Sequence, residues 1–328
     1  MESLLNKNQS LLIKGIAILL MLLHHLFFVR NGLYDDIHLF GDHYLVHSIG
    51  VFGKLCVALF VFLSGYGLTV SQKGIINLKS FYTHRFKKLF LNYWFIWLIF
   101  VPIGVFVFKR TFADVYGTHI LPKAFLDFWG VLFSFGYKGY NPTWWFYSCI
   151  ITLYVLFPLL YKKLDKWPLL IITSCILVSF MRSIPPIAPI SDYLLPFVTG
   201  IWMAKQPVNK FDCISIWEVV ICFIGLAIFR NFSGGYVFII DTLLCVCIAL
   251  FVNKVVFPKL LNGVLIEFGK HSMNIFLFHT FIYLYWFTDL IYFTRNPLII
   301  FLELTIVCYL ISVIIEFVKR KVGFYRLV

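Results

Sequence analysis

The chain has 328 residues, of which 61% are hydrophobic and only 13% are charged. Soluble domains are about 45–50% apolar and about a quarter charged, so a soluble fold of this composition would expose large apolar patches. The composition excludes a soluble domain, a disordered chain, collagen and a coiled coil. We expect residues 1–328 to form a single all-α integral membrane domain, with no additional soluble domain.

A net charge of +13 would indicate nucleic-acid binding in a soluble protein, but here Lys and Arg form short clusters between apolar runs. The positive-inside rule explains these clusters, so no nucleic-acid partner is expected. Nearly all of the eight cysteines lie within apolar runs, which favours buried thiols over disulfides or metal ligands. His43 and His47 lack a third ligand at a firm spacing, so no metal site is predicted.

About 20 apolar residues are needed to cross the bilayer, and the chain offers about ten such transmembrane helices. The predicted spans are 11–29, 51–70, 89–108, 144–161, 168–181, 191–204, 214–229, 236–252, 272–291 and 298–318. With the N-terminus in the cytoplasm, 19 of the 28 Lys and Arg residues fall on the inner side. The predicted fold is therefore a polytopic membrane helix bundle with both termini cytoplasmic.

One long loop, 109–143, carries most of the charge on the outer side. It contains an apolar stretch, 125–135, that is too short to cross the bilayer and suits an interfacial or re-entrant position. We expect this loop to cap a cavity from outside.

Lys14 and His25 lie eleven residues apart in the first predicted span. Eleven residues turn a helix about 20° past three full turns, so the two side chains share one face about 16 Å apart. Ionisable groups inside membrane spans are costly and are often functional. The alternative is that Lys14 snorkels to the inner interface and His25 hydrogen-bonds a neighbouring helix, and the spacing leaves both open. His24 points about 100° away.

Other polar features are ambiguous when each is taken alone. Ser64 and Gly65 favour close helix packing over direct chemistry. Arg85 and Lys88, at the start of the third span, fit either flanking positive charge or a basic pocket for phosphates. His279 lies at membrane depth, where a structural histidine is the commoner outcome.

Two tryptophans, Trp144 and Trp145, stand at the entrance of the fourth span, which continues through Tyr154. Tryptophans at a span entrance usually anchor the helix in the membrane interface. Stacking against a sugar ring is the alternative.

In their order along the chain, these features resemble the acyltransferase 3 family, bacterial membrane enzymes that O-acylate surface polysaccharides and other acceptors. The family's first span has an arginine, a glycine and then a histidine eleven residues after the arginine, and Lys14, Gly15 and His25 occupy these places. The second-span Phe-x-x-Ser-Gly signature is matched by Ser64 and Gly65.

The resemblance continues to the end of the chain. The basic entrance to the third span is matched by Arg85 and Lys88, and the following Trp-to-Tyr run by Trp145 and Tyr154. A late Gly-x-x-Ser-x-x-Ile-x-x-x-His pattern runs from Gly269 to His279.

The chain departs from the family pattern at three positions. Lys14 replaces the arginine, Leu91 stands where a proline is common, and Ile150 stands where many members carry a glutamate. Lysine keeps the positive charge but loses the bidentate fork of the guanidinium group.

The resemblance implies transfer of an acyl group, most often acetyl, from acyl-coenzyme A to a hydroxyl of a cell-surface or lipid-linked glycan. Acetyl-CoA would be the donor substrate, with no permanently bound cofactor, and glycan assembly proteins would be partners in the bacterial plasma membrane. His25 would be the general base. The implied donor-binding residues are Lys14, Arg85 and Lys88, and the implied supporting residues are Ser64, Trp145, Tyr154 and His279.

Two other functions remain open at this point. A glycan exporter would also suit ten helices with aromatic, weakly charged interiors, but it would not consume acetyl-CoA in vesicles. A non-catalytic scaffold of a glycan assembly complex should tolerate the loss of His25.

Overall fold

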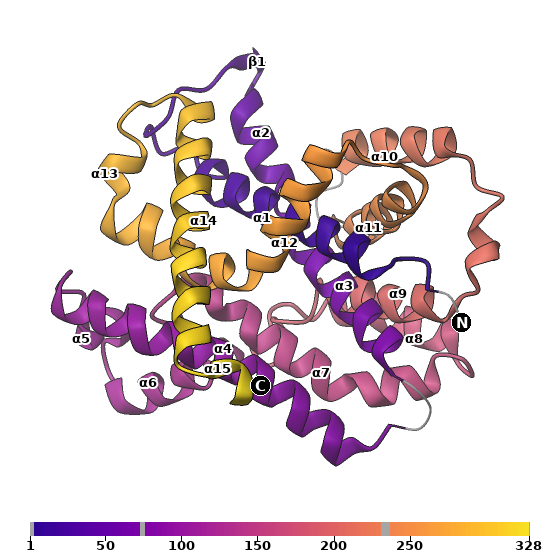
Figure 1. Cartoon of the computed structure of the whole chain (residues 1–328), viewed down its shortest axis with the longest axis horizontal. Coiled ribbons are helices and arrows are strands. Elements are labelled where there is room, and N and C mark those ends of the chain that lie inside the picture. The colour runs from indigo at the N-terminus through magenta and orange to yellow at the C-terminus, as the bar shows by residue number, and fades with distance from the viewer. Residues whose placement is uncertain (1–2, 73–75, 231–236, 328) are drawn as a thin grey trace. The chain divides into compact units, whose positions relative to one another are not determined.

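The computed structural model describes residues 3–72, 76–230 and 237–327. Helices dominate these ranges, and the strands found there are the short antiparallel pair β1 (His38–Phe40) and β2 (His43–Tyr44) (Figure 1). This confirms the predicted all-α membrane helix bundle.

Six helical segments in the described ranges are long and apolar enough to cross a membrane. They comprise α1 (Lys7–Phe27), α2 with α3 (Leu45–Phe52 and Leu55–Ser71), α4 (Leu78–Phe106), η2 with α7 (Pro142–Trp144 and Trp145–Lys163), α11 (Val237–Lys254) and α14 (Pro297–Lys321). The other helices at predicted spans are α8 (Pro168–Ser179), α9 (Leu194–Lys205), α10 (Ile216–Arg230) and α12 (Lys259–Thr280). Every predicted span thus overlaps a helix, but the span predicted at 272–291 is not one continuous α-helix, because α12 ends at Thr280 and the shorter η5 and α13 follow it. The number of helices that cross the bilayer and the side of the termini stay predictions.

Two helices begin more than ten residues earlier than the apolar pattern predicts. α4 starts at Leu78 and α12 at Lys259, so both include a polar segment before the apolar run. Apolar content marks the part of a helix that lipid can surround, but the helix itself continues wherever its backbone hydrogen bonds continue. The remaining short elements are η3 (Val208–Phe211), α5 (Phe112–Tyr116), α6 (Ile120–Phe128), η1 (Leu132–Phe135), the π-helical η5 (Phe281–Trp286), α13 (Thr288–Ile291) and α15 (Phe324–Leu327).

The chain divides into two compact units. The first comprises Met1–Gly15, Val57–Tyr82 and Ser148–Gly269. The second comprises Ile16–Cys56, Thr83–Tyr147 and Lys270–Val328. Each unit is built from segments far apart in the sequence, and α1, α3, α4, α7 and α12 contribute residues to both.

In the first unit, glycines allow α3 and α9 to touch backbone to backbone. A Cβ at Gly65 would lie 2.2 Å from the carbonyl oxygen of Phe197, and a Cβ at Gly200 would lie 2.2 Å from that of Phe62. Small residues permit such close approach in membranes, where packing drives helix association. The packing interpretation of Gly65 is therefore correct.

The same device joins α1 and α12. A Cβ at Gly15 would lie 1.9 Å from the carbonyl oxygen of Leu265, and one at Gly269 would lie 2.0 Å from that of Leu11. Both glycines belong to motifs that carry the family resemblance, so part of that resemblance reflects helix packing.

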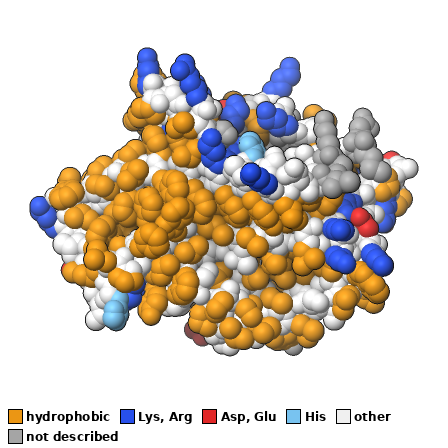
Figure 2. Space-filling view, turned by 90° about the horizontal axis from the view of Figure 1, so that it is seen from below, with side chains coloured by type: hydrophobic (Ala, Val, Ile, Leu, Met, Phe, Trp, Pro, Cys, Tyr) orange, Lys and Arg blue, Asp and Glu red, His pale blue; other side chains and the backbone are white. Residues whose placement is uncertain are grey.

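Large apolar side chains remain on the surface, as a chain surrounded by lipid requires. Leu169, Trp217 and Leu260 are 76%, 72% and 81% exposed. Figure 2 shows hydrophobic side chains across the face in view, with Lys and Arg gathered toward its margins. All eight cysteines are free thiols, and six of them are buried as predicted, whereas Cys213 and Cys222 are exposed.

Gly65→Ala should destabilise the protein by about 1–3 kcal/mol, because the added methyl group meets the α9 backbone, which cannot yield easily. Gly67→Ala is the matched control, since a Cβ at Gly67 has no atom within 4 Å. Thermal unfolding in detergent measures both. Equal unfolding temperatures for the two variants would contradict the close contact.

Candidate functional site

His25, near the end of α1, and His279, near the end of α12, lie side by side in the second unit. Their ring centroids are 4.9 Å apart and their planes are inclined by 44°. The ring of Tyr283 in η5 lies 6.3 Å from His25 and 5.9 Å from His279. His25 is half-buried and His279 is fully buried. Tertiary structure therefore joins two histidines that are far apart in the sequence.

The surrounding helix fixes the tautomer of His279. Its Nδ1 lies 2.9 Å from the carbonyl oxygen of Phe276 and 3.1 Å from that of Ile275. Carbonyl oxygens only accept hydrogen bonds, so we assign the ring proton to Nδ1. Nε2 of the neutral ring is then an acceptor, and it lies 3.3 Å from the hydroxyl oxygen of Thr280.

A chain of polar groups links this imidazole to the end of the long loop. The Thr143 hydroxyl lies 3.4 Å from that of Thr280 and donates to Asn141 Oδ1 at 2.7 Å. Because the single hydroxyl proton of Thr143 goes to Asn141 and His279 Nε2 is an acceptor, Thr280 must be the donor in both of its contacts. Thr280 has one hydroxyl proton, so it can donate to Thr143 or to His279 but not to both at once.

The same loop end is fastened to the backbone of α12. The carbonyl oxygen of Leu277 accepts from Trp144 Nε1 at 2.9 Å and from Asn141 Nδ2 at 3.2 Å. α12 ends at Thr280 and η5 follows it, and such π-helical turns are frequent at functional sites. Trp144 is thus a buried hydrogen-bond donor, a role that neither interface anchoring nor sugar stacking predicted.

Asp127 organises the long loop from inside. Its Oδ2 accepts from the Tyr116 hydroxyl at 2.6 Å and from the Tyr140 backbone N–H at 2.8 Å. Its backbone oxygen accepts from the Tyr93 hydroxyl at 2.6 Å. Burial raises the pKa of Asp127 to about 6, although the bonds from Tyr116 and Tyr140 and the charge of Arg110 act in the opposite direction.

Arg110 closes the base of the loop. Its guanidinium group lies 4.4 Å from the ring of Tyr140 and 3.7 Å from that of Tyr285, and it donates to the Tyr140 carbonyl oxygen at 2.6 Å. The Tyr140 hydroxyl donates back to the Arg110 carbonyl oxygen at 2.7 Å. Two aromatic rings and one carbonyl oxygen thus contact the guanidinium group of Arg110.

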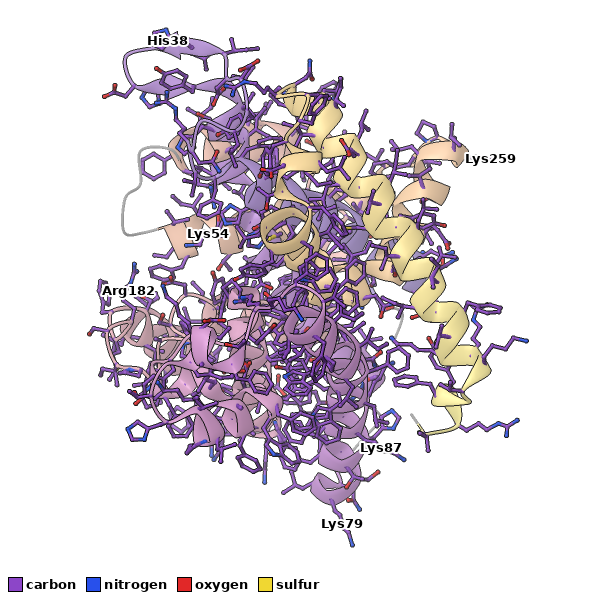
Figure 3. All side chains as sticks on the ribbon, turned by 90° about the vertical axis from the view of Figure 1, so that its left-hand side faces the viewer. His38, Lys54, Lys79, Lys87, Arg182 and Lys259 are labelled. Carbon is purple, nitrogen blue, oxygen red and sulfur yellow. The ribbon has the colours of Figure 1, made fainter. Side chains whose placement is uncertain are left out.

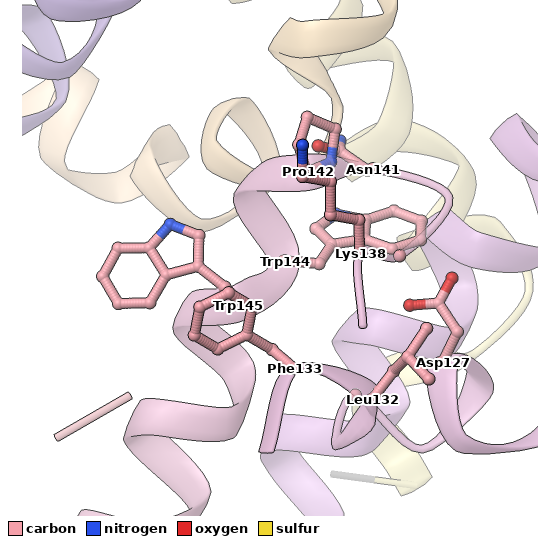
Figure 4. A pocket seen from close by; sticks show the side chains of 10 residues that line it. Asp127, Leu132, Phe133, Lys138, Asn141, Pro142, Trp144 and Trp145 are labelled. Atoms are coloured by element: carbon pink, nitrogen blue, oxygen red, sulfur yellow. The ribbon is translucent and has the colours of Figure 1, made fainter. Parts of the chain in front are cut away.

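A cavity of about 170 Å³ lies within this loop (Figure 4). Its walls comprise Asp127, Gly130, Leu132, Phe133, Lys138, Gly139, Asn141, Pro142, Trp144 and Trp145. We had predicted that the loop would cap a cavity from outside, and the structure places this cavity among the loop's own residues. Trp145 contributes a half-buried indole to its wall.

The predicted donor-binding residues occupy two helices. Arg85 and Lys88 lie on α4 in the second unit, where Arg85 is half-buried and Lys88 is exposed. Lys79 and Lys87 extend this basic stretch of α4 (Figure 3). Lys14 lies on α1 in the first unit and is half-buried. Their role in donor binding stays a prediction.

Ser64 and Tyr154 also lie in the first unit, on α3 and α7, and both are half-buried. His25, Trp145 and His279 lie in the second. Of the predicted residues, His25 and His279 are in direct ring contact.

Sequence reasoning missed Lys319, which it counted among the flanking charges of the C-terminus. Lys319 is 1% exposed. Its ammonium group donates to Asn274 Oδ1 at 2.7 Å and to Asn92 Oδ1 at 2.8 Å, and it lies 3.5 Å from Glu316 Oε1. The available signal was the pair Asn92 and Asn274, each of which is followed by an apolar run of its helix.

His24 has a separate structural contact. Its Nδ1 lies 2.9 Å from the carbonyl oxygen of Gly50 in α2. A Cβ at Gly50 would lie 2.6 Å from the carbonyl carbon of Phe27, so α1 and α2 pack tightly there. His24 therefore contacts α2, a different neighbour from that of His25.

Residues 11–317 match the family model Acyl_transf_3, which is described as an acyltransferase domain. The match covers nearly the whole chain and includes both histidines of the ring pair. Neither a curated protein nor a solved structure matches the chain.

Asp127→Asn should change how stability depends on pH. Between pH 4 and 6 native Asp127 holds a proton that the unfolded chain, with its pKa near 3.8, has released, so wild-type stability falls as pH rises. At about 1.4 kcal/mol per pKa unit, this amounts to roughly 3 kcal/mol. The stability of Asp127→Asn relative to the wild type should therefore increase up to about pH 6 and then stay constant.

Thermal unfolding of both proteins across this range measures the difference. Asp114→Asn is the matched control in the same loop. For Asp114 the pH dependence of stability should have the opposite sign. Hydrogen bonds from Thr111 lower the pKa of Asp114, so its charge stabilises the native state as pH rises. A pH-independent difference between wild type and Asp127→Asn would contradict a raised pKa.

Proposed function

Because the chain belongs to the acyltransferase 3 family and is a membrane acyltransferase, we propose that it transfers an acetyl group from acetyl-CoA to a glycan hydroxyl. The acceptor is a cell-surface or lipid-linked saccharide, and the enzyme works in the bacterial plasma membrane beside glycan assembly proteins. The observation that carries the proposal is the contact of His25 with His279, with ring centroids 4.9 Å apart, in the part of the chain that matches the family.

His25 acts as the general base. It is the less buried member of the pair, whereas His279 is fully buried, so a substrate would reach His25 first. His25 takes the proton from the acceptor hydroxyl while the oxygen attacks the thioester carbonyl carbon. The tetrahedral intermediate then expels the coenzyme thiolate, which receives that proton from His25.

His279 positions His25 through ring contact. The carbonyl oxygens of Ile275 and Phe276 hold its Nδ1 proton, so its ring cannot rotate without losing these bonds. A fixed imidazole gives His25 one packed surface and restricts its orientation, which general base catalysis requires.

Lys14, Arg85 and Lys88 supply positive charge for the phosphates of the donor. Arg85 adds the planar fork that pairs with two phosphate oxygens at once, and the two lysines act as point charges. Their exposure, from half-buried to exposed, is compatible with contact to a soluble donor. Ser64 and Tyr154 support the helices of the first unit.

His25→Ala should lower the rate of acetyl transfer by about 10²- to 10⁴-fold, because the general base is lost. His24→Ala is the adjacent control, and its loss should be milder because His24 contacts the Gly50 carbonyl oxygen. Acetyl transfer in membrane vesicles, normalised to protein amount, measures both. Full activity of His25→Ala at normal abundance would end the assignment of His25 as base.

Lys14→Gln should raise the KM for acetyl-CoA about ten- to a hundredfold, the range expected when a charged hydrogen bond to phosphate is lost. Lys14→Arg should preserve transfer, because it keeps the charge. If Lys14 only snorkels to the interface, Lys14→Gln will leave the KM unchanged. Initial rates in vesicles at saturating acceptor distinguish these results.

A further inference from the structure

The cavity within the long loop contains a carboxylate with one oxygen engaged. Asp127 is 2% exposed, and its Oδ2 accepts hydrogen bonds from both the Tyr116 hydroxyl and the Tyr140 N–H. Among residues 3–72, 76–230 and 237–327, no donor is found for Oδ1. Oδ1 is not one of the fully buried, unpaired polar atoms of these residues, so it keeps some surface toward the cavity that Asp127 lines, where it can accept a hydrogen bond from a ligand.

Gly139 keeps that oxygen accessible. A Cβ at position 139 would lie 2.3 Å from Oδ1 and 3.1 Å from the carboxyl carbon of Asp127. Any larger residue would therefore cover the carboxylate or push it aside. The absence of a side chain at Gly139 leaves Oδ1 facing the cavity that both residues line.

The rest of the wall is aromatic. Trp145 is half-buried, and its ring lies 6.1 Å from that of Phe133 (Figure 4). An indole face beside a hydrogen-bond acceptor suits a ligand with one apolar face and polar edges, and the ring of a sugar has this character. The exposed Lys138 also lines the cavity.

The size of the cavity agrees with one sugar ring. Its volume of about 170 Å³ equals that of roughly five or six waters at about 30 Å³ each. A single pyranose with its hydroxyl groups occupies a similar space, whereas the coenzyme part of an acyl donor is several times larger.

The cavity is also connected to the histidine pair. Asn141 and Trp144 line it, and both hydrogen-bond the Leu277 carbonyl oxygen, two residues before His279. Asn141 also begins the polar chain through Thr143 and Thr280 to His279 Nε2. A ligand in the cavity therefore touches the residues that are bonded to the helix of the catalytic pair.

We infer that this cavity is a subsite for one sugar ring of the acceptor, with ring hydroxyls donating to Asp127 Oδ1 and the ring face lying on Trp145. The inference rests on the proposed function and adds the place where the acceptor is held. The carboxylate disfavours the phosphates of the donor, so the cavity is reserved for a neutral, hydroxyl-rich ligand.

The test uses the full chain in lipid nanodiscs and a panel of methyl glycopyranosides of neutral hexoses, N-acetylhexosamines and a uronic acid. Binding is followed by saturation-transfer NMR. At least one neutral glycoside should bind the wild type, and Asp127→Asn and Trp145→Ala should each weaken it about tenfold or more. Asn can still accept from Tyr116 and Tyr140, so Asp127→Asn should stay folded.

Matched controls lie outside the cavity. Asp114→Asn changes another carboxylate of the same loop, and Trp217→Ala removes a tryptophan that is 72% exposed. Both should bind the glycosides as the wild type does. Gly139→Ala should lose binding, because its methyl group meets Asp127 Oδ1.

Kinetics separate this inference from the proposed function. Asp127→Asn should raise the KM for the glycan acceptor and leave the KM for acetyl-CoA unchanged, while His25→Ala should lose transfer and keep glycoside binding. A raised KM for acetyl-CoA, or no glycoside binding to an active wild type, would overturn the subsite. Binding that depends on Asp127, without any consumption of acetyl-CoA, would contradict the proposed function and support the subsite.

Discussion

In hydrocarbon a polar group must find its hydrogen-bond partner within the protein, because no water is present to satisfy it. This constraint explains the surroundings of the histidine pair. His279 bonds the carbonyl oxygens of its own helix, and Lys319 is surrounded by two asparagines and a glutamate. The polar groups of the long loop are satisfied in the same way, since Trp144 and Asn141 both donate to the Leu277 carbonyl oxygen.

Close packing supplies the second requirement, a fixed position for each helix. Glycines at 15, 65, 200 and 269 bring backbones together within each pair of helices in the first unit. In the second unit, Gly50 does the same for α1 and α2. Helices in lipid gain little from burying apolar surface. These close backbone contacts therefore contribute much of the stability of the helix bundle. Several glycines in family-like motifs are thus explained by packing.

The candidate site combines a rigid part with an adaptable one. The imidazole pair lies on long helices, whereas the proposed sugar subsite is built from short helices and turns around Asp127. A carboxylate held by Tyr116 and Tyr140 gives those turns a fixed centre. Under the proposed function, chemistry on helices and recognition on a loop would allow the acceptor to vary while the reacting groups stay in place.

The sequence by itself determined the membrane class, the helices at every predicted span and the family, because hydropathy and motif order are local in the chain. It also singled out His25 and His279, since an imidazole at membrane depth is costly. Only the tertiary structure decided that these rings touch, that Trp144 is a buried donor and that Asp127 faces a cavity. Each of these depends on segments distant in sequence, and their contacts follow from helix packing that no local pattern encodes.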